Sequence, residues 1–158
     1  MATEIERKFT VILNEWKDQG DSVHSIQAYL SVGPPFSVRV RIMDGSAKLN
    51  IKESTLDIER AEFEYEIPES DARKLLDGPL VGHAVEKRRH YINHEGHLWE
   101  VDEFLGDNEG LVIAEIELKS RDESFAKPSW LGDEVSGDPK YLNSSLAQRP
   151  YTTWNTPS

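Results

Sequence analysis

Glu4, Glu6 and Lys8 open the chain with charged side chains at alternate positions, within the run EIERKFTV. On a β-strand, alternate side chains point to the same face, so two carboxylates and an ammonium group would lie side by side. Carboxylate oxygens are ligands for hard divalent cations, and an ammonium group pairs with anions. The opening run therefore indicates a strand face that could hold a metal ion, an anionic ligand or both.

The same spacing of charges recurs along the chain, and each later pair keeps a single sign. These pairs are Arg39 and Arg41, Glu62 and Glu64, Lys87 and Arg89, Glu100 and Asp102, and Glu115 and Glu117. Strand faces exposed to water mix the signs of their charges more freely. Like charges stacked on one face repel, so the sorting favours acidic pairs that face basic pairs or a metal ion, and basic pairs that face a polyanion.

Eight strands are predicted to position these pairs. Apolar and polar residues alternate over the segments 3–12, 24–32, 36–42, 47–52, 60–67, 85–92, 97–104 and 111–119. Asp44-Gly45 is a hairpin turn signal, and Glu69–Leu76 has the apolar stripe of a short helix that ends before Gly78-Pro79. Residues 122–149 indicate helices and turns, and the nine residues that follow indicate a loosely held tail.

Closing these strands into a barrel would place the charged faces in the lumen and the apolar faces outside, under helices. The acidic lumen candidates are Glu4, Glu6, Glu62, Glu64, Glu100, Asp102, Glu115 and Glu117, and the basic ones are Lys8, Arg39, Arg41, Lys52, Arg60, Lys87 and Arg89. Buried charges are costly unless they are paired, hydrated or ligated. We therefore expect an all-β-dominated α+β fold, a closed eight-stranded antiparallel β-barrel whose water-filled tunnel binds a polyphosphate and, through hard oxygen ligands, Mg²⁺ or Mn²⁺.

Length and composition restrict the class of protein. The chain has 158 residues and no cysteine, which predicts one domain over residues 1–150, a tail over 151–158, no disulfides and a reducing, cytoplasmic location. Charges within residues 2–8 argue against a signal peptide, and no apolar run approaches the roughly 20 residues of a membrane span. The net charge of −11 argues against general binding to nucleic acids or anionic membranes, although clustered cations can still bind a small anion.

In their order along the chain, these motifs resemble those of the CYTH family, the triphosphate tunnel metalloenzymes. The matching elements are E-x-E-x-K at 4–8, R-x-R at 39–41, Lys52, R-x-E-x-E at 60–64, K-x-R at 87–89, the acidic pair Glu100 and Asp102, and E-x-E at 115–117. The run GDPKYLNSSLA over 137–147 resembles the C-terminal segment of short bacterial members, with Lys140 where an arginine is expected. The ordered set makes the resemblance specific, whereas E-x-E-x-K alone is only moderately so.

The resemblance implies a triphosphate-containing substrate and divalent metal ions, two in each active site. Known members include inorganic tripolyphosphatases, thiamine triphosphatases, RNA triphosphatases and class IV adenylate cyclases. No inserted segment offers recognition of a base or a thiazolium ring, so we expect hydrolysis of inorganic tripolyphosphate to pyrophosphate and phosphate. A class IV-type adenylate cyclase, a thiamine or nucleoside triphosphatase, and a non-catalytic binder of polyphosphate or nucleotide stay open as alternatives.

The resemblance also implies roles for individual side chains. Substrate binding falls to Lys8, Arg39, Arg41, Lys52, Arg60, Lys87, Arg89 and Lys140. Metal binding falls to Glu4, Glu6, Glu62, Glu64, Asp102, Glu115 and Glu117, and catalysis to Glu4, Glu6, Lys8, Lys52 and Lys87. No nucleic-acid or membrane partner is expected. A homodimer would need a helix or an outer-face patch, because a closed barrel has no free strand edge.

Overall fold

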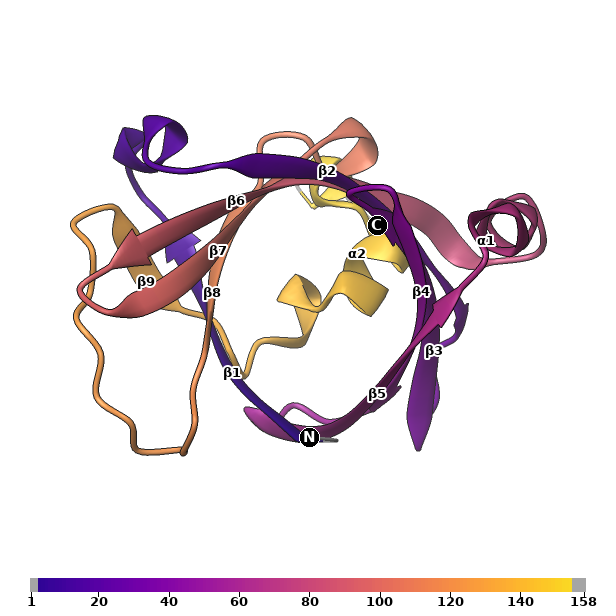
Figure 1. Cartoon of the computed structure of the whole chain (residues 1–158), viewed down its shortest axis with the longest axis horizontal. Helices are drawn as coiled ribbons and strands as arrows, with labels where there is room; N and C mark the ends of the chain where they lie inside the picture. The colour runs from indigo at the N-terminus through magenta and orange to yellow at the C-terminus, as the bar shows by residue number, and fades with distance from the viewer. Residues whose placement is uncertain (1–2, 155–158) are drawn as a thin grey trace.

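The computed structural model describes residues 3–154, and its strands close into an antiparallel barrel (Figure 1). The wall consists of β1 (Thr3–Val11), β2 (Ser22–Ser31), β3 (Phe36–Met43), β4 (Ser46–Glu53), β5 (Glu59–Ile67), β6 (Val81–His94), β7 (His97–Phe104) and β8 (Val112–Glu117). Their order around the wall is β5-β4-β3-β2-β6-β7-β8-β1, and β1 closes the ring by pairing with β5 at Thr3 and Ala61. The predicted eight-stranded barrel is therefore confirmed.

A ninth strand, β9 (Leu131–Glu134), pairs with the end of β1 next to the closed ring. The sequence predicted only helices and turns over residues 122–149, and this prediction is wrong at β9. The run LGDE contains glycine and two acidic residues, which are depleted in strands. Its pairing with Phe9 and Val11, and not its own propensity, makes it a strand.

Within residues 3–154, two α-helices and four short 3-10 turns lie between the strands or after the last one. They are α1 (Glu69–Leu76), α2 (Asn143–Gln148) and the turns Glu15–Asp18, Gly106–Asn108, Pro139–Tyr141 and Tyr151–Thr153. α1 has the bounds that its sequence predicted, and its Ala72 packs against Val40 and Ala47 on the outer face of the barrel. No helix in the described range is long and apolar enough to cross a membrane.

The largest hydrophobic cluster lies on the outer face of the barrel wall. Phe9, Trp99, Ile116 and Trp130 are buried together there, and Phe125, from the segment between β8 and β9, packs against them. The rings of Phe9 and Trp99 meet edge to face at 5.7 Å. Because these strands bury their apolar faces outside, their charged faces are left to line the lumen.

α2 covers one end of the barrel lumen (Figure 1). Its Leu146 and Ala147 are buried against Val85 and Phe104, which occupy lumen-side positions on β6 and β7. Gly82 has φ +74°, and a Cβ at this position would collide with the carbonyl group of Ala147. Only glycine fits such a conformation and so close an approach, so β6 can hold α2 tightly against the end of the barrel.

Part of the predicted C-terminal tail packs against the barrel. Tyr151 and Trp154 join the cluster around α2, and the Tyr151 N–H donates to Asn108 Oδ1 at 2.8 Å. These contacts hold residues 151–154 in place. Residues 155–158 lie outside the described range.

We expect the outer cluster to dominate the stability of the barrel. Ile116→Ala removes buried methyl groups and leaves a cavity beside Trp99, so it should lower the free energy of unfolding by about 2–5 kcal/mol. Leu98→Ala is the matched control, because Leu98 is 47% exposed and should cost about 0.5 kcal/mol or less. Urea unfolding of both variants measures the difference. Equal losses would show that this cluster is not the core.

Candidate functional site

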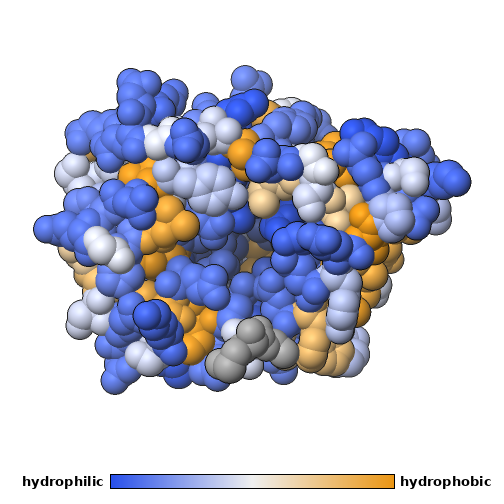
Figure 2. All heavy atoms as spheres, viewed as in Figure 1, coloured by the Kyte–Doolittle hydropathy of each residue, from blue (hydrophilic) through white to orange (hydrophobic). Residues whose placement is uncertain are grey.

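The charged strand faces enclose a cavity of about 530 Å³ inside the barrel. Figure 2 shows hydrophilic side chains around a hollow at the centre of the molecule. The lining residues that the sequence predicted are Glu4, Glu6, Lys8, Arg39, Arg41, Lys52, Arg60, Glu62, Glu64, Lys87, Arg89, Glu100, Glu115 and Glu117. The structure therefore brings the whole predicted set to one cavity, except Asp102 and Lys140.

Acidic and basic pairs occupy opposite halves of the cavity wall. Around the ring, β7, β8, β1 and β5 carry the acidic pairs and are contiguous, whereas β4, β3 and β6 carry Lys52, the arginine pair and the Lys87–Arg89 pair, with β2 between the last two. In the acidic half, like charges are direct cross-strand neighbours: Glu100 lies opposite Glu115, and Glu6 opposite Glu117. Such neighbours destabilise a sheet unless a counter-charge relieves them. In the basic half, burial and the positive charges of Arg39 and Arg89 lower the pKa of Arg41. The acidic half therefore suits a cation and the basic half an anion.

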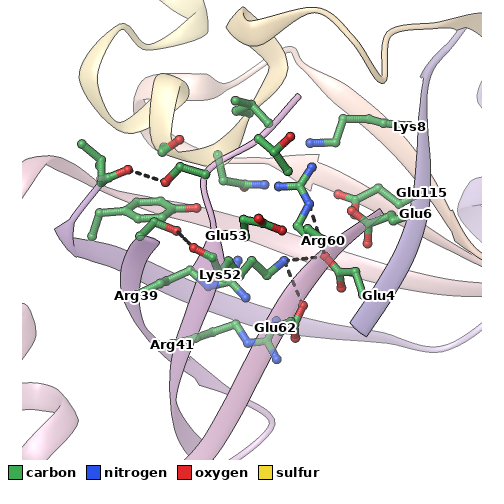
Figure 3. Close-up of a pocket in the computed structure, with 18 of the residues that line it drawn as sticks. Glu4, Glu6, Lys8, Arg39, Arg41, Lys52, Glu53, Arg60, Glu62 and Glu115 are labelled. Carbon is green, nitrogen blue, oxygen red and sulfur yellow. Dashed lines mark hydrogen bonds and ion pairs between the residues drawn. The ribbon is translucent and has the colours of Figure 1, made fainter. Parts of the chain in front are cut away.

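Ion pairs form where the two halves meet. At the boundary between β4 and β5, Lys52 Nζ lies 3.3 Å from Glu62 Oε2 and 3.1 Å from Glu4 Oε1 (Figure 3). At the boundary between β6 and β7, Arg89 Nη1 donates to Glu100 Oε2 at 2.9 Å. These pairs neutralise the edges of the two halves.

Lys8 and Arg39 have no ion-pair partner within residues 3–154. Arg39 is 6% exposed, and its Nε is buried without a hydrogen-bond partner. Lys8 projects from the acidic half, but its Nζ donates to a neutral acceptor, the carbonyl oxygen of Tyr141, at 3.2 Å. A buried cation with unsatisfied N–H groups is costly until water or an anion fills the site. The cavity thus has unused capacity to bind an anion.

Glu6 and Glu115 form a pair of carboxyl groups on the acidic half (Figure 3). Burial, together with the charge of Glu115, raises the pKa of Glu6 well above its ordinary value. Burial also opposes ionisation of Glu115, but the charge of Lys8 and the hydrogen bond from Glu6 outweigh it and lower the pKa of Glu115. The pair therefore keeps a shared proton to a higher pH than an isolated glutamate would, with Glu6 as the more basic member.

Glu4 and Glu62 form a second such pair. Burial and the hydrogen bond with Glu62 raise the pKa of Glu4. Burial disfavours the ionised form of Glu62, but the hydrogen bond from Glu4 and the charge of Lys52 prevail and lower its pKa. The Oε2 atom of Glu62 is buried and has no hydrogen-bond partner, although Lys52 lies nearby.

These two carboxyl pairs fit a hard divalent cation. Such a cation would displace the proton that each pair shares and would give Glu62 Oε2 the partner that it lacks. In the described part of the chain, no three carboxylate or imidazole groups converge as a preformed metal site. Binding would therefore have to draw the two pairs together.

Asp102 lies behind the cavity wall and not in it. It is fully buried, and its two oxygens accept hydrogen bonds from Lys87 Nζ at 2.7 Å and from Arg89 Nε and Nη2 at 2.8 and 2.9 Å. Both oxygens are thus occupied by cations of the protein. The expectation that Asp102 is a metal ligand disagrees with this geometry, because alternation along a strand gives the face of a residue but not its depth.

Lys140 does not reach the cavity either. Its Nζ lies 4.8 Å from the ring centroid of Trp154 and 5.4 Å from that of Tyr141, a cation–π arrangement at the surface. The expectation that Lys140 binds substrate disagrees with this position. The residues of the same motif that line the cavity are Asn143 and Ser144.

Sequence reasoning missed the neutral residues of the cavity. They include Ser37, Ser54, Thr55, Asn143, Ser144 and Gln148. Ser37 occupies a lumen-side position on β3, so strand alternation was a usable signal for it. The residues of α2 gave no such signal, because a helix that lies over the end of a barrel has no fixed register with the strands.

Comparison with known proteins agrees with this architecture. The CYTH domain model matches residues 2–151. An inorganic triphosphatase of Acetivibrio thermocellus is 46% identical over 96% of this chain and 97% of its own length, and one of Nitrosomonas europaea is 33% identical over 92% and 97%. The crystal structure of the inorganic triphosphatase NE1496 superposes with a TM-score of 0.68 at 31% identity, over 93% of this chain and 95% of that one. The chain therefore belongs to the CYTH domain family.

Proposed function

We propose that this chain is a metal-dependent triphosphatase that hydrolyses inorganic triphosphate to pyrophosphate and phosphate. The observation that carries the proposal is the division of one cavity into an acidic half and a basic half, with like charges close together in both. A divalent cation and a polyphosphate relieve both halves at once. The names of the relatives at 46% and 33% identity support the same activity.

The substrate's phosphate oxygens would lie against the cations of the cavity. The residues proposed for this role are Lys8, Arg39, Arg41, Lys52, Arg60, Lys87 and Arg89. We expect the strongest new contacts at Arg39 and Lys8, because neither forms a direct salt bridge with a carboxylate in the described structure. Guanidinium groups offer paired N–H donors that match phosphate oxygens, whereas an ammonium group acts as a point charge.

The acidic half would hold two Mg²⁺ or Mn²⁺ ions. The proposed ligands are Glu4, Glu6, Glu62, Glu64, Glu115 and Glu117, and Glu64 is the weakest candidate because Lys48 and Asn50 already bind its oxygens. Carboxylate oxygens without thiolates suit these hard ions. A bound ion of this type would stabilise charge on phosphate oxygens and lower the pKa of a water molecule.

The protein's own side chains supply position and charge. The basic half holds several phosphates in a row, so binding energy from phosphates remote from the reacting one can lower the barrier. Lys8 is proposed to contact the phosphoryl group that is transferred, because it projects from the acidic half toward the cations of the basic half. Lys52 links the halves through Glu4 and Glu62.

We further propose a cytoplasmic enzyme with one catalytic domain over residues 1–150. Its partner would be a small anionic substrate, not a nucleic acid or a membrane, because a net charge of −11 repels large polyanions while the cavity gathers cations in one place. A homodimer would have to use the outer face, where Phe63 and Tyr65 of β5 are exposed.

A substrate panel tests the activity. Tripolyphosphate should be hydrolysed at least about tenfold faster in kcat/KM than ATP or pyrophosphate, a difference of roughly 1.4 kcal/mol. Pyrophosphate leaves cations unpaired, and ATP must place its adenosine in a cavity without an evident aromatic cradle. Phosphate release at fixed free Mg²⁺ is the measurement. Equal rates on ATP, or cyclic AMP as the main product, would assign the chain to nucleotide chemistry, and binding without turnover would make it a binder.

Glu6→Gln tests the acidic half. The change keeps the size of the side chain but removes its ability to ionise, so kcat should fall about 10–100-fold at saturating Mg²⁺, with a smaller rise in KM. Glu66→Gln is the matched control on β5, because Glu66 does not line the cavity, and it should stay within about twofold of wild type. Normal turnover by Glu6→Gln would remove Glu6 from the metal site.

The pH dependence of kcat/KM tests the role of Lys87. Burial lowers the pKa of Lys87 to about 8; the negative charge of Asp102 opposes the shift and the positive charge of Arg89 adds to it. The ammonium form binds phosphate, so kcat/KM should fall as the pH rises through about 8. The measurement is kcat/KM between pH 7 and 9.5 at constant free Mg²⁺. Lys87→Arg should not show this fall in kcat/KM, because a guanidinium group stays charged over this range. A flat pH profile for the wild type would contradict the role proposed for Lys87.

A further inference from the structure

Two lysines of the cavity donate hydrogen bonds to the same short C-terminal segment. Lys8 Nζ donates to the carbonyl oxygen of Tyr141 at 3.2 Å, and Lys87 Nζ donates to the side-chain oxygen of Asn143 at 3.3 Å. The two lysines come from β1 and β6, which are far apart in sequence. The segment from Tyr141 to Asn143 therefore contacts the substrate-facing cations from the end of the barrel that α2 covers.

Both acceptors are electrically neutral, which matters for an anion-binding site. A carboxylate would satisfy an ammonium proton and cancel its charge as well, as Glu4 does for Lys52. A carbonyl or amide oxygen fixes the direction of the ammonium group and leaves its charge available to a ligand. The contact at Asn143 must involve Oδ1, because an ammonium group can only donate.

Asp102 is the one carboxylate that Lys87 contacts within the described residues, and it does not serve Lys87 alone. It also accepts two hydrogen bonds from Arg89, which forms a further ion pair with Glu100. The bonds to Asp102 and Asn143 use two of the three ammonium protons. Within the described residues the third has no acceptor and is free for a phosphate oxygen.

α2 is held firmly enough to position Asn143. Leu146 is buried in the cluster that contains Val85 and Phe104, two residues on the same side of the wall as Lys87. Gly82 allows the backbone of α2 to approach β6 closely. Asn143 is the first residue of this helix, so the packing of α2 fixes its backbone position. From there its Oδ1 accepts the hydrogen bond from Lys87.

We propose that Asn143 is a positioning residue, which aims the ammonium group of Lys87 at the phosphates through a neutral hydrogen bond. The inference rests on the proposed triphosphatase function. It makes α2 part of the active site, beyond its role as a cover over one end of the barrel. Asn143 itself acts through Lys87 and not on the reacting atoms.

Two substitutions separate positioning from packing. Asn143→Ala removes the acceptor but leaves the charge of Lys87, so kcat on tripolyphosphate should fall about tenfold while KM changes less than about threefold. Asn143→Asp keeps the acceptor but adds a negative charge that neutralises Lys87 and repels phosphate, so KM should rise at least about tenfold. Ser145→Ala is the control on the same helix and should change neither by more than about twofold. Thermal unfolding of each variant checks that α2 stays in place.

A double-mutant cycle tests whether Asn143 acts through Lys87. In a Lys87→Met background, adding Asn143→Ala should change kcat/KM by less than about twofold. The same tenfold loss in both backgrounds would overturn the proposal, as would wild-type kinetics for Asn143→Ala.

Calorimetric titration with tripolyphosphate in metal-free buffer gives a readout independent of turnover. Asn143→Asp should weaken binding at least about tenfold, and Asn143→Ala less than about threefold. Equal weakening by the two variants would mean that Asn143 only packs α2, which overturns the inference whether or not the wild-type protein hydrolyses tripolyphosphate. Wild-type binding without hydrolysis would defeat the proposed function alone, and the absence of wild-type binding would defeat both.

Discussion

Repulsion between like charges inside a closed barrel is the constraint on which the rest of the structure depends. Glu100 and Glu115 are cross-strand neighbours in the acidic half of the wall, and in the basic half burial and the charges of Arg39 and Arg89 lower the pKa of Arg41. Salt bridges form at the boundaries between the halves, where Lys52 reaches Glu62. Burial and the charge of Glu115 raise the pKa of Glu6, which favours its neutral form and relieves part of the acidic half. A ligand of mixed charge, metal ions with a polyphosphate, relieves both halves at once.

This constraint decides where the protein places its hydrophobic core. A lumen filled with charges cannot stabilise the fold by apolar burial, so the strands must bury apolar side chains on their outer faces. Trp99 of β7 does so beneath Phe125 and Trp130 of the segment that precedes β9, and Ala72 of α1 covers Val40. The outer elements therefore hold the wall in shape against the repulsion inside it. Closure of β1 onto β5 then removes the free strand edges of the wall.

The sequence predicted the barrel and most of the cavity because alternation along a strand assigns a face to every residue. That rule identified Arg39, Glu62 and Glu115 as lumen residues without any knowledge of strand order. It gave no depth along the tunnel, so Asp102 was expected in the cavity although Lys87 and Arg89 enclose it behind the wall. It also failed outside the strands, where tertiary contacts and not periodicity place β9 and α2.

The cations of the cavity differ in how far the protein neutralises them, and this difference indicates where an anion gains most. Lys52 is paired with two carboxylates, Arg89 pairs with Asp102 and Glu100, Lys87 contacts Asp102, and Arg39 forms no salt bridge within residues 3–154. A phosphate group would therefore gain the most new contacts beside Arg39 and the fewest beside Lys52. The strands place these cations on the wall, and Tyr141 and Asn143 add neutral oxygens that accept hydrogen bonds from Lys8 and Lys87. A neutral acceptor leaves the charge of a lysine available to an anion, whereas a carboxylate cancels it. The type of acceptor thus determines how strongly each lysine can bind an anion.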